Sequence, residues 1–227
     1  QNAFIGPNAV VSEACYSTTY VVNSQTITSS VCPGGVNSDI SGGAPCDTTN
    51  YSGCRHGTLV GGIVAGDGDG VTYNFDGVAT GASLMSVQVF SYDETTPDTL
   101  VGWQSDLILG MERVLAVHQD AGNGIQISSV LLALGETNPG VACDTYKPSL
   151  KIAIDNLRSA GIATIAASGN AAASLVDFPA CISSVISVGA STSGDVEWYK
   201  DALTGSNEGP DLDLYAPGES IISVDDF

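Results

Sequence analysis

The residues best suited to chemistry in this sequence are His56, which opens a glycine-rich apolar segment, and Asn170, which follows an apolar run. An imidazole exchanges protons near neutral pH, so His56 could act as a general base and acid. A carboxamide such as Asn170 can donate a hydrogen bond to an oxygen that becomes negative during acyl transfer. Each residue also has a structural alternative. His56 could be a core-edge histidine bonded to a backbone carbonyl, and Gly169-Asn170 could be an ordinary turn after a strand.

Both residues are placed by elements that the sequence predicts. Leu59, Val60, Ile63 and Val64 recur at helical spacing, which predicts a short helix with His56 at its head and one buried face. The apolar run 162–167 predicts a buried strand, and Asn170 follows it directly. In an open parallel sheet, active sites gather beyond the carboxyl ends of the strands.

The rest of the chain alternates predicted strands and helices. The spacing predicts helices over 98–119, with His118 as a structural residue favoured by the helix dipole, and over 148–160, ended by Gly161. Further strands are predicted at 82–90, 125–134, 185–188, 212–215 and 221–224. Residues 10–11 could open a strand, whereas 23–53 is predicted as a long surface excursion. This alternation indicates an α/β fold with an open, mostly parallel sheet.

Composition excludes several classes of partner. The chain has 227 residues, enough for one α/β domain, and its 25 acidic residues against 6 basic ones give a net charge of -19. Such a surface repels phosphates, so we expect neither nucleic acid nor an anionic membrane as a partner. The sequence has no apolar run long enough to span a bilayer. It has no initiator Met or signal peptide at Gln1, which suggests a processed chain or part of a longer one.

The cysteines indicate an oxidising compartment. The sequence has six cysteines, no Cys-x-x-Cys pair and two histidines, so disulfides are favoured over a zinc site or six free core thiols. Cys143 and Cys181 each lie just outside a predicted strand in the same half of the chain, and we expect them to be bonded. The remaining cysteines should pair among themselves and tether the N-terminal excursion: Cys15, Cys32, Cys46 and Cys54.

One acidic turn is a weak candidate for a metal site. Asp67 and Asp69 alternate with glycines just after the His56 segment, and two carboxylates in a flexible turn could hold a structural calcium ion. A solvated acidic turn is the simpler interpretation. A calcium-stiffened extracellular module therefore stays open as an alternative function.

Several segments resemble those of the subtilisin-like serine proteases, peptidase family S8, and they stand in the family's order. His56, Gly57, Thr58, Val60 and Gly62 match the family's histidine motif, although Leu59 and Gly61 depart from it. The other similar segments are Gly77-Val78-Ala79, 133–135 with Ala133 in place of serine, 165–170 around the oxyanion asparagine, 178–181 leading into 185–190, and 213–218. The resemblance runs from about His56 to Gly218.

The resemblance implies a subtilisin-like three-layer α/β sandwich with a mostly parallel sheet flanked by helices. It implies a secreted, monomeric serine endopeptidase that acts on peptides or proteins and requires no cofactor, with calcium possible as a structural ion. His56 would be general base and then general acid, and Asn170 the oxyanion donor. In the family an extended substrate pairs with the edge matched here by Ala133, Leu134 and Gly135; we also expect substrate near Leu100, Val101 and Gly102.

Two parts of the family's site are missing from the sequence. No Asp-Ser/Thr-Gly ends an apolar strand ahead of His56; the nearest imitation, Asp39-Ile40-Ser41-Gly42, is predicted in a polar loop. No Gly-Thr-Ser is present, and Ser83, Ser220 and Ser223 lie in predicted strands or at their start. We therefore expect a partial catalytic domain, incomplete at both ends and inactive as it stands, with an excursion over 1–53 and an α/β core over 54–227. A pseudoenzyme that binds peptides without cleaving them is the alternative.

Overall fold

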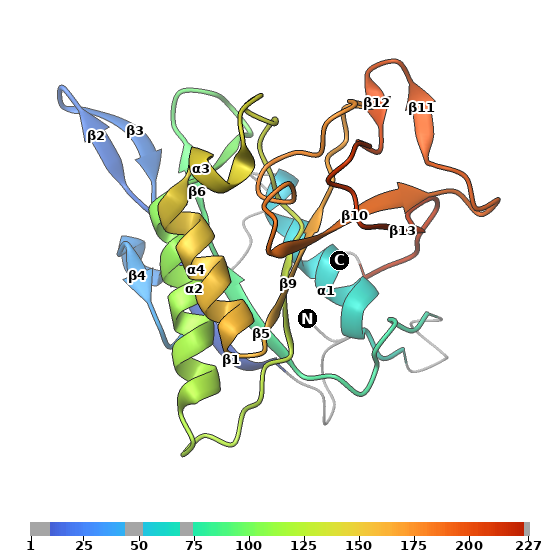
Figure 1. The fold of residues 1–227 in the computed structure, drawn as a ribbon. Helices are drawn as coiled ribbons and strands as arrows, with labels where there is room; N and C mark the ends of the chain where they lie inside the picture. Colours follow the sequence, from blue (N-terminus) through green and yellow to red (C-terminus); the bar gives the residue numbers. More distant parts are fainter. Residues whose placement is uncertain (1–9, 44–51, 69–74, 225–227) are drawn as a thin grey trace. The chain divides into compact units, whose positions relative to one another are not determined.

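The computed structural model describes residues 10–43, 52–68 and 75–224 (Figure 1). The chain divides into two compact units, one made of residues 1–113 and 222–227 and the other of residues 114–221. Helix α2 (Gln104–Gln119) runs across the division. In the described part of the chain, no helix combines the length and the apolar character needed to cross a membrane.

The first unit holds two small sheets. One has the strand order β4-β1-β5, with β4 at Ser38–Asp39, β1 at Val10–Tyr16 and β5 at Leu84–Gln88. In it β1 pairs in parallel with β5 and antiparallel with β4. The other is antiparallel, with the order β2-β3-β6-β7 at Tyr20–Val22, Gln25–Ser29, Phe90–Asp93 and Leu100–Gly102. Among its described residues, the helical segments are the 3-10 turns at Pro33–Gly35 and Ser52–Arg55, the helix α1 at His56–Ala65, and the start of α2.

Three predictions for this unit are wrong in their details. The predicted excursion contains strand β3, because Thr28 and Ser29 pair with β6. The predicted helix over 98–119 begins only at Gln104, since residues 100–102 pair with β6 instead. Residues 221–224 form no strand: the Ser223 hydroxyl donates to the backbone oxygen of Leu59 in α1, at 2.6 Å.

The second unit is built on a fully parallel sheet (Figure 1). Its strand order is β13-β10-β9-β8, with bounds Leu214–Pro217, Val185–Ser191, Ala163–Ala167 and Ser129–Leu132. The short helix α3 (Cys143–Tyr146) and the helix α4 (Pro148–Ser159) follow β8. A small hairpin of β11 (Tyr199–Asp201) and β12 (Thr204–Gly205) projects beyond β10, at the upper right of Figure 1. The mixed α/β architecture and its parallel sheet are as predicted.

Helix α4 shows how the sequence sets the bounds of an element. Pro148 begins it, where a missing N–H costs nothing, and Leu150, Ile154 and Leu157 are buried at helical spacing. Gly161 ends it in a left-handed conformation, with φ of 83°. The N–H of Ile162 then bonds the oxygen of Leu157, a Schellman ending that satisfies a terminal carbonyl and directs the chain into β9.

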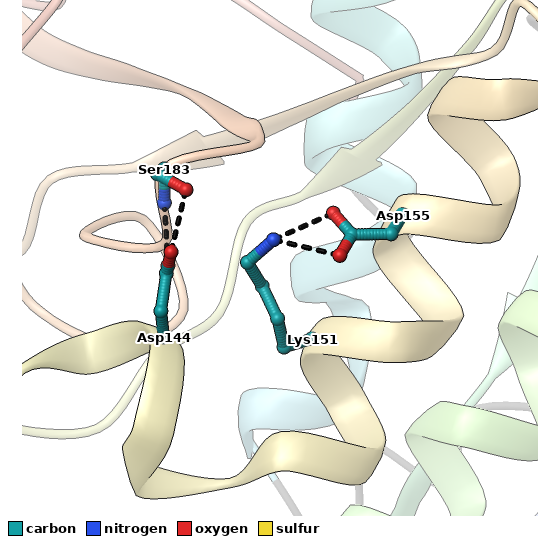
Figure 2. Close-up of polar contacts among 4 residues, drawn as sticks. All are labelled: Asp144, Lys151, Asp155 and Ser183. Atoms are coloured by element: carbon teal, nitrogen blue, oxygen red, sulfur yellow. Dashed lines mark hydrogen bonds and ion pairs between the residues drawn. The ribbon is translucent and has the colours of Figure 1, made fainter.

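A disulfide joins α3 to the loop ahead of β10. Cys143 is bonded to Cys181, as expected, with their Cα atoms 5.9 Å apart. Beside it the Asp144 carboxylate accepts hydrogen bonds from the Ser183 N–H at 2.9 Å and from its hydroxyl at 2.6 Å (Figure 2). The covalent bond and the paired hydrogen bonds therefore fix the same two segments together.

The other disulfide that the structure describes lies in the first unit. Cys15 of β1 is bonded to Cys32, and this confirms that N-terminal cysteines pair with one another. Cys54 is also disulfide-bonded. Cys46 lies outside the described residues, so its pairing stays a prediction.

Candidate active site

His56 is the first residue of α1, as its sequence pattern predicts, and it is exposed. The opposite end of this helix is anchored by the segment that follows Phe75. The N–H groups of Val78 and Ala79 bond the carbonyls of Ile63 and Val64, at 2.9 and 2.8 Å, and so satisfy terminal carbonyls of the helix. The helix that carries His56 is therefore fixed by backbone contacts at its carboxyl end.

The predicted apolar face of α1 is only partly buried. Leu59, Val60 and Val64 are half-buried and Ile63 is 37% exposed, so the buried residues of the helix are Gly62 and Ala65. A Cβ on Gly62 would lie 2.5 Å from the Ser223 hydroxyl oxygen. Because Gly62 has no Cβ, the segment around Ser223 can pack closely against α1.

One predicted substrate segment lies beside the turn that precedes His56. Leu100, Val101 and Gly102 form strand β7. A Cβ on Gly53 would be 3.5 Å from Leu100 Cδ1, so this side chain packs against the turn that leads into α1. Within the first unit, strand β7 therefore lies against the turn that immediately precedes His56.

The longest strand that the structure describes ahead of His56 is β1, which ends at Tyr16 and is followed by Ser17 and Thr18. None of the three is acidic. The carboxylate that reaches this end of β1 belongs to Asp106, in the first turn of α2 and 2% exposed. It accepts from the Thr18 N–H at 2.9 Å and from the Thr18 hydroxyl at 2.7 Å, so it holds the end of β1.

Asp39, the nearest sequence imitation of the family's aspartate, ends a strand rather than lying in a polar loop. It belongs to β4 and pairs with Cys15 of β1. Its Oδ1 accepts from the Ser41 N–H at 2.8 Å and from the Ser41 hydroxyl at 2.7 Å. These hydrogen bonds hold the pKa of Asp39 below its usual value, and they commit Oδ1 to the following turn.

In the second unit, Asn170 and the segment 133–135 lie at the carboxyl ends of adjacent parallel strands. Asn170 follows β9 by three residues, and Ala133 follows β8 directly. The two strands pair in register, with Leu132 opposite Ala166. Asn170 therefore lies at the carboxyl edge of the sheet, as predicted, and it is exposed there.

A carboxylate that sequence analysis missed lies between these two segments. The Asp177 N–H donates to the oxygen of Ser168 at 2.8 Å, which ties it to the Asn170 segment. Its Oδ1 accepts from the Asn138 N–H at 3.1 Å, and a Cβ on Gly135 would lie 3.0 Å from the oxygen of neighbouring Phe178. Burial raises the pKa of Asp177, and the bond from Asn138 offsets this only in part.

Gly169 allows two side chains to approach the backbone beside Asn170. Its φ is +114°, and a Cβ there would be 2.3 Å from both Asp177 Oδ2 and Asn207 Nδ2. Asn207 is fully buried, and its Oδ1 accepts from the N–H groups of Ala171 and Ala173. The sequence Gly205-Ser206-Asn207 resembles an exposed turn, so no local pattern pointed to this residue.

The remaining candidates have simpler roles or stay untested. His118 is structural, as expected, but through its Nδ1, which accepts from the Ile127 N–H at 3.1 Å and needs no cationic imidazole. Asp67 is exposed, whereas Asp69 lies outside the described residues. Within the described residues no three His, Cys, Asp or Glu side chains gather as a metal site, and the calcium hypothesis stays a prediction.

Comparison with known proteins identifies the family. The sequence model of the subtilase family matches residues 32–226, most of the chain. The chain belongs to the subtilase family. The subtilase match includes His56, Asn170, 100–102 and 133–135, the candidates named from sequence.

Individual relatives agree with this assignment. The subtilase is 32% identical over 194 residues to subtilisin E of Bacillus subtilis (strain 168), covering 82% of this chain and 44% of the relative. It is 29% identical over 189 residues to subtilisin BL of Lederbergia lenta, covering 82% and 60% respectively. The chain thus spans about half the length of these curated relatives.

Solved structures support the subtilisin-like fold. The prenylagaramide maturation protease PagA aligns with a TM-score of 0.57 and 25% identity, over 74% of this subtilase chain and 53% of PagA. A cold adapted subtilisin-like serine proteinase aligns with a TM-score of 0.53 and 25% identity, over 74% and 50%. The fold predicted from the sequence motifs is therefore that of the family.

Proposed function

We propose that the whole protein containing these residues is an exported serine endopeptidase. His56 takes the proton of the nucleophilic serine and returns it to the leaving amine, while Asn170 donates to the oxyanion. The observation that carries this proposal is the position of Asn170. It stands exposed at the carboxyl edge of a parallel sheet, one strand from the segment 133–135 that resembles the family's substrate edge.

The proposed reaction proceeds through an acyl-enzyme. The serine oxygen forms a bond to the scissile carbonyl carbon as its proton passes to His56, and the carbonyl oxygen becomes the oxyanion beside Asn170. The intermediate collapses when the C–N bond breaks and His56 protonates the amine. Water then attacks the ester with His56 again as base, which releases the acid and regenerates the serine.

We propose that the nucleophile is not a serine of this chain. The sequence lacks Gly-Thr-Ser, and Ser223 already donates its hydroxyl to the oxygen of Leu59. Ser83 and Ser220 are exposed but stand in no strand-to-helix turn of the kind that presents a nucleophile. These residues alone should therefore not form an acyl-enzyme.

We further propose that the protein is exported, acts on peptides or proteins as a monomer, and has no nucleic-acid or membrane partner. The disulfides Cys15–Cys32 and Cys143–Cys181 suit an oxidising compartment. The net charge of -19 disfavours phosphate-rich partners.

A second candidate function is peptide binding without cleavage. The observation that favours it is the end of β1, where Tyr16, Ser17 and Thr18 stand and Asp106 is committed to Thr18. A carboxylate that orients the imidazole strengthens it as a general base, and none of the three residues at the end of β1 supplies one. The family's substrate-binding edge would nevertheless remain.

One experiment separates the two candidates. The whole natural polypeptide that contains these 227 residues is incubated with a denatured protein and with a fluorophosphonate probe that labels reactive serines. The endopeptidase proposal expects cleavage and labelling, both abolished by His56→Ala, with labelling at a serine outside this chain. Peptide binding without cleavage or labelling would overturn it in favour of the second candidate. Stoichiometric labelling of Ser83, Ser220 or Ser223 would refute the assignment of the nucleophile.

A further inference from the structure

Residues 169–173, which carry Asn170, are bonded along their length by a later segment of the second unit. Residues 205–208 make backbone hydrogen bonds along them: the N–H of Gly205 donates to Asn170 O at 3.2 Å, and that of Asn207 to Gly169 O at 3.0 Å. Glu208 N–H bonds Ala173 O at 2.9 Å. The main chain on both sides of Asn170 is therefore fixed by residues about 35 positions later in the sequence.

Asn207 makes the side-chain part of this clamp. Its Oδ1 accepts from Ala171 N–H at 2.8 Å and from Ala173 N–H at 3.1 Å. An amide nitrogen cannot accept from an N–H, so these two donors fix which end of the amide faces the segment. With its backbone bond to Gly169, Asn207 contacts the segment before and after Asn170 while it is itself 0% exposed.

The clamped segment has an unfavourable backbone conformation that needs such support. Gly169 has a φ of +114°, and Ala172 has a φ of +49°, which is uncommon for a residue with a Cβ. Conformations of this kind persist where surrounding contacts over-determine them. The two bonds to Asn207 Oδ1 come from the residues on either side of Ala172, so they stabilise this conformation directly.

The other end of the amide faces Gly169. A Cβ on that glycine would lie 2.3 Å from Asn207 Nδ2, and within the described part of the chain this nitrogen has no hydrogen-bond partner. A buried donor without a partner costs desolvation free energy, so we expect the Asn207 side chain to contribute something that offsets this cost. Supplying Oδ1 at this position is such a role.

We propose that Asn207 is a positioning residue for Asn170: it fixes the backbone of 169–173 so that the exposed Asn170 carboxamide keeps one direction. This proposal rests on the proposed function, in which Asn170 is the oxyanion donor. Asn207 touches neither substrate nor reacting atoms, and it acts on the reaction only through the geometry of Asn170. A donor displaced by about 1 Å loses much of its value in the transition state.

The kinetic test is a double-mutant cycle in the whole protein. Asn207→Ala should lower kcat by about tenfold to a hundredfold with KM little changed, since the misplaced donor serves the transition state. In an Asn170→Ala background the same substitution should have little further effect, because the residue through which it acts is gone. Asn123→Ala is the matched control. It removes a bond to Val117 O and one from Ile125 N–H in the same unit, and kcat should be unchanged.

A second measurement needs no activity. In the 227-residue chain, amide hydrogen exchange at Ala171 and Ala173 should accelerate at least tenfold in Asn207→Ala and stay unchanged in Asn123→Ala. Equal exchange in wild type and Asn207→Ala would overturn the clamp. A kcat loss that is the same with and without Asn170 would overturn the positioning role. If wild type hydrolyses nothing, the proposed function fails by itself, and the exchange result alone decides whether Asn207 holds the segment.

Discussion

Replacing Gly169 by alanine should be far more damaging than the loss of one glycine suggests. The added Cβ would stand 2.3 Å from two side-chain atoms, Asp177 Oδ2 and Asn207 Nδ2. Ordinary contact requires each to retreat by roughly 1 Å, and overpacking of this kind costs about 1–3 kcal/mol. The backbone conformation, with φ of +114°, adds about 1–2 kcal/mol for any residue with a Cβ. The expected loss of unfolding free energy is therefore about 2–5 kcal/mol.

Gly161→Ala separates the two contributions. Gly161 also has a positive φ, +83°, but a Cβ there would meet no atom within 4 Å. Its substitution should cost only the backbone part, about 1–2 kcal/mol. In a chain of this size each kcal/mol lowers the Tm by about 2–4 °C. We expect a fall of about 4–20 °C for Gly169→Ala and about 2–8 °C for Gly161→Ala.

The assay is thermal unfolding of both variants and wild type, followed by circular dichroism at the same concentration and pH. Truncating one obstacle gives an internal check. In Gly169→Ala/Asn207→Ala, the second substitution removes Nδ2 from the path of the new Cβ, so the two costs should be less than additive. Equal Tm values for Gly169→Ala and Gly161→Ala would refute the reasoning, because the crowding would then contribute nothing.

Three further predictions concern the second unit. Cys143→Ala/Cys181→Ala opens a link across 38 residues, which should cost about 4 kcal/mol and lower the Tm by about 8–16 °C; an unchanged Tm would contradict this. Burial raises the pKa of Asp144, but hydrogen bonds from Ser183 and the charge of Lys151 outweigh it and leave the pKa lowered. The ionised Asp144 carboxylate therefore stabilises the fold above about pH 4, and this stabilisation is lost as pH falls through the folded pKa. In urea unfolding, Asp144→Asn should thus lose less unfolding free energy relative to wild type in acid than at pH 7. Burial raises the pKa of Asp177 in the folded protein above its unfolded value. The folded protein therefore loses stability as pH rises through the interval between these two pKa values. Asp177→Asn should therefore raise the Tm at pH 7 and not in acid, and a lower Tm at pH 7 would contradict this.

The elements that carry the candidate residues could be predicted because their signals are local. Helix α1 begins at His56, as its apolar spacing from Leu59 onward indicates, and α4 runs from Pro148 to just before Gly161. The Cys143–Cys181 bond was predicted because each cysteine lies just outside a predicted strand in the same half of the chain. In each case the deciding contacts lie within a few residues, or the two partners are marked by their chemical type.

The errors arose where contacts with another segment override the preference of the local sequence. Residues 100–102 have apolar spacing that continues into α2, but hydrogen bonds to β6 make them a strand. Residues 221–224 are as apolar as a strand, yet the contact of Ser223 with Leu59, 164 positions earlier, decides their course. No short window of sequence contains both Ser223 and Leu59.

The same reasoning explains why Asn170 was visible in the sequence and Asn207 was not. Asn170 follows a buried strand and matches a family motif, so its type and place both point to chemistry. Asn207 stands in a Gly-Ser-Asn sequence typical of solvent-exposed turns, yet it is fully buried and its hydrogen bonds go to Gly169, Ala171 and Ala173, far earlier in the sequence. An exposed donor is useful in catalysis only if its backbone is rigid, and here a buried polar side chain supplies that rigidity. Substitutions at Asn207 should therefore change activity through Asn170, although nothing in the local sequence marks the residue as functional.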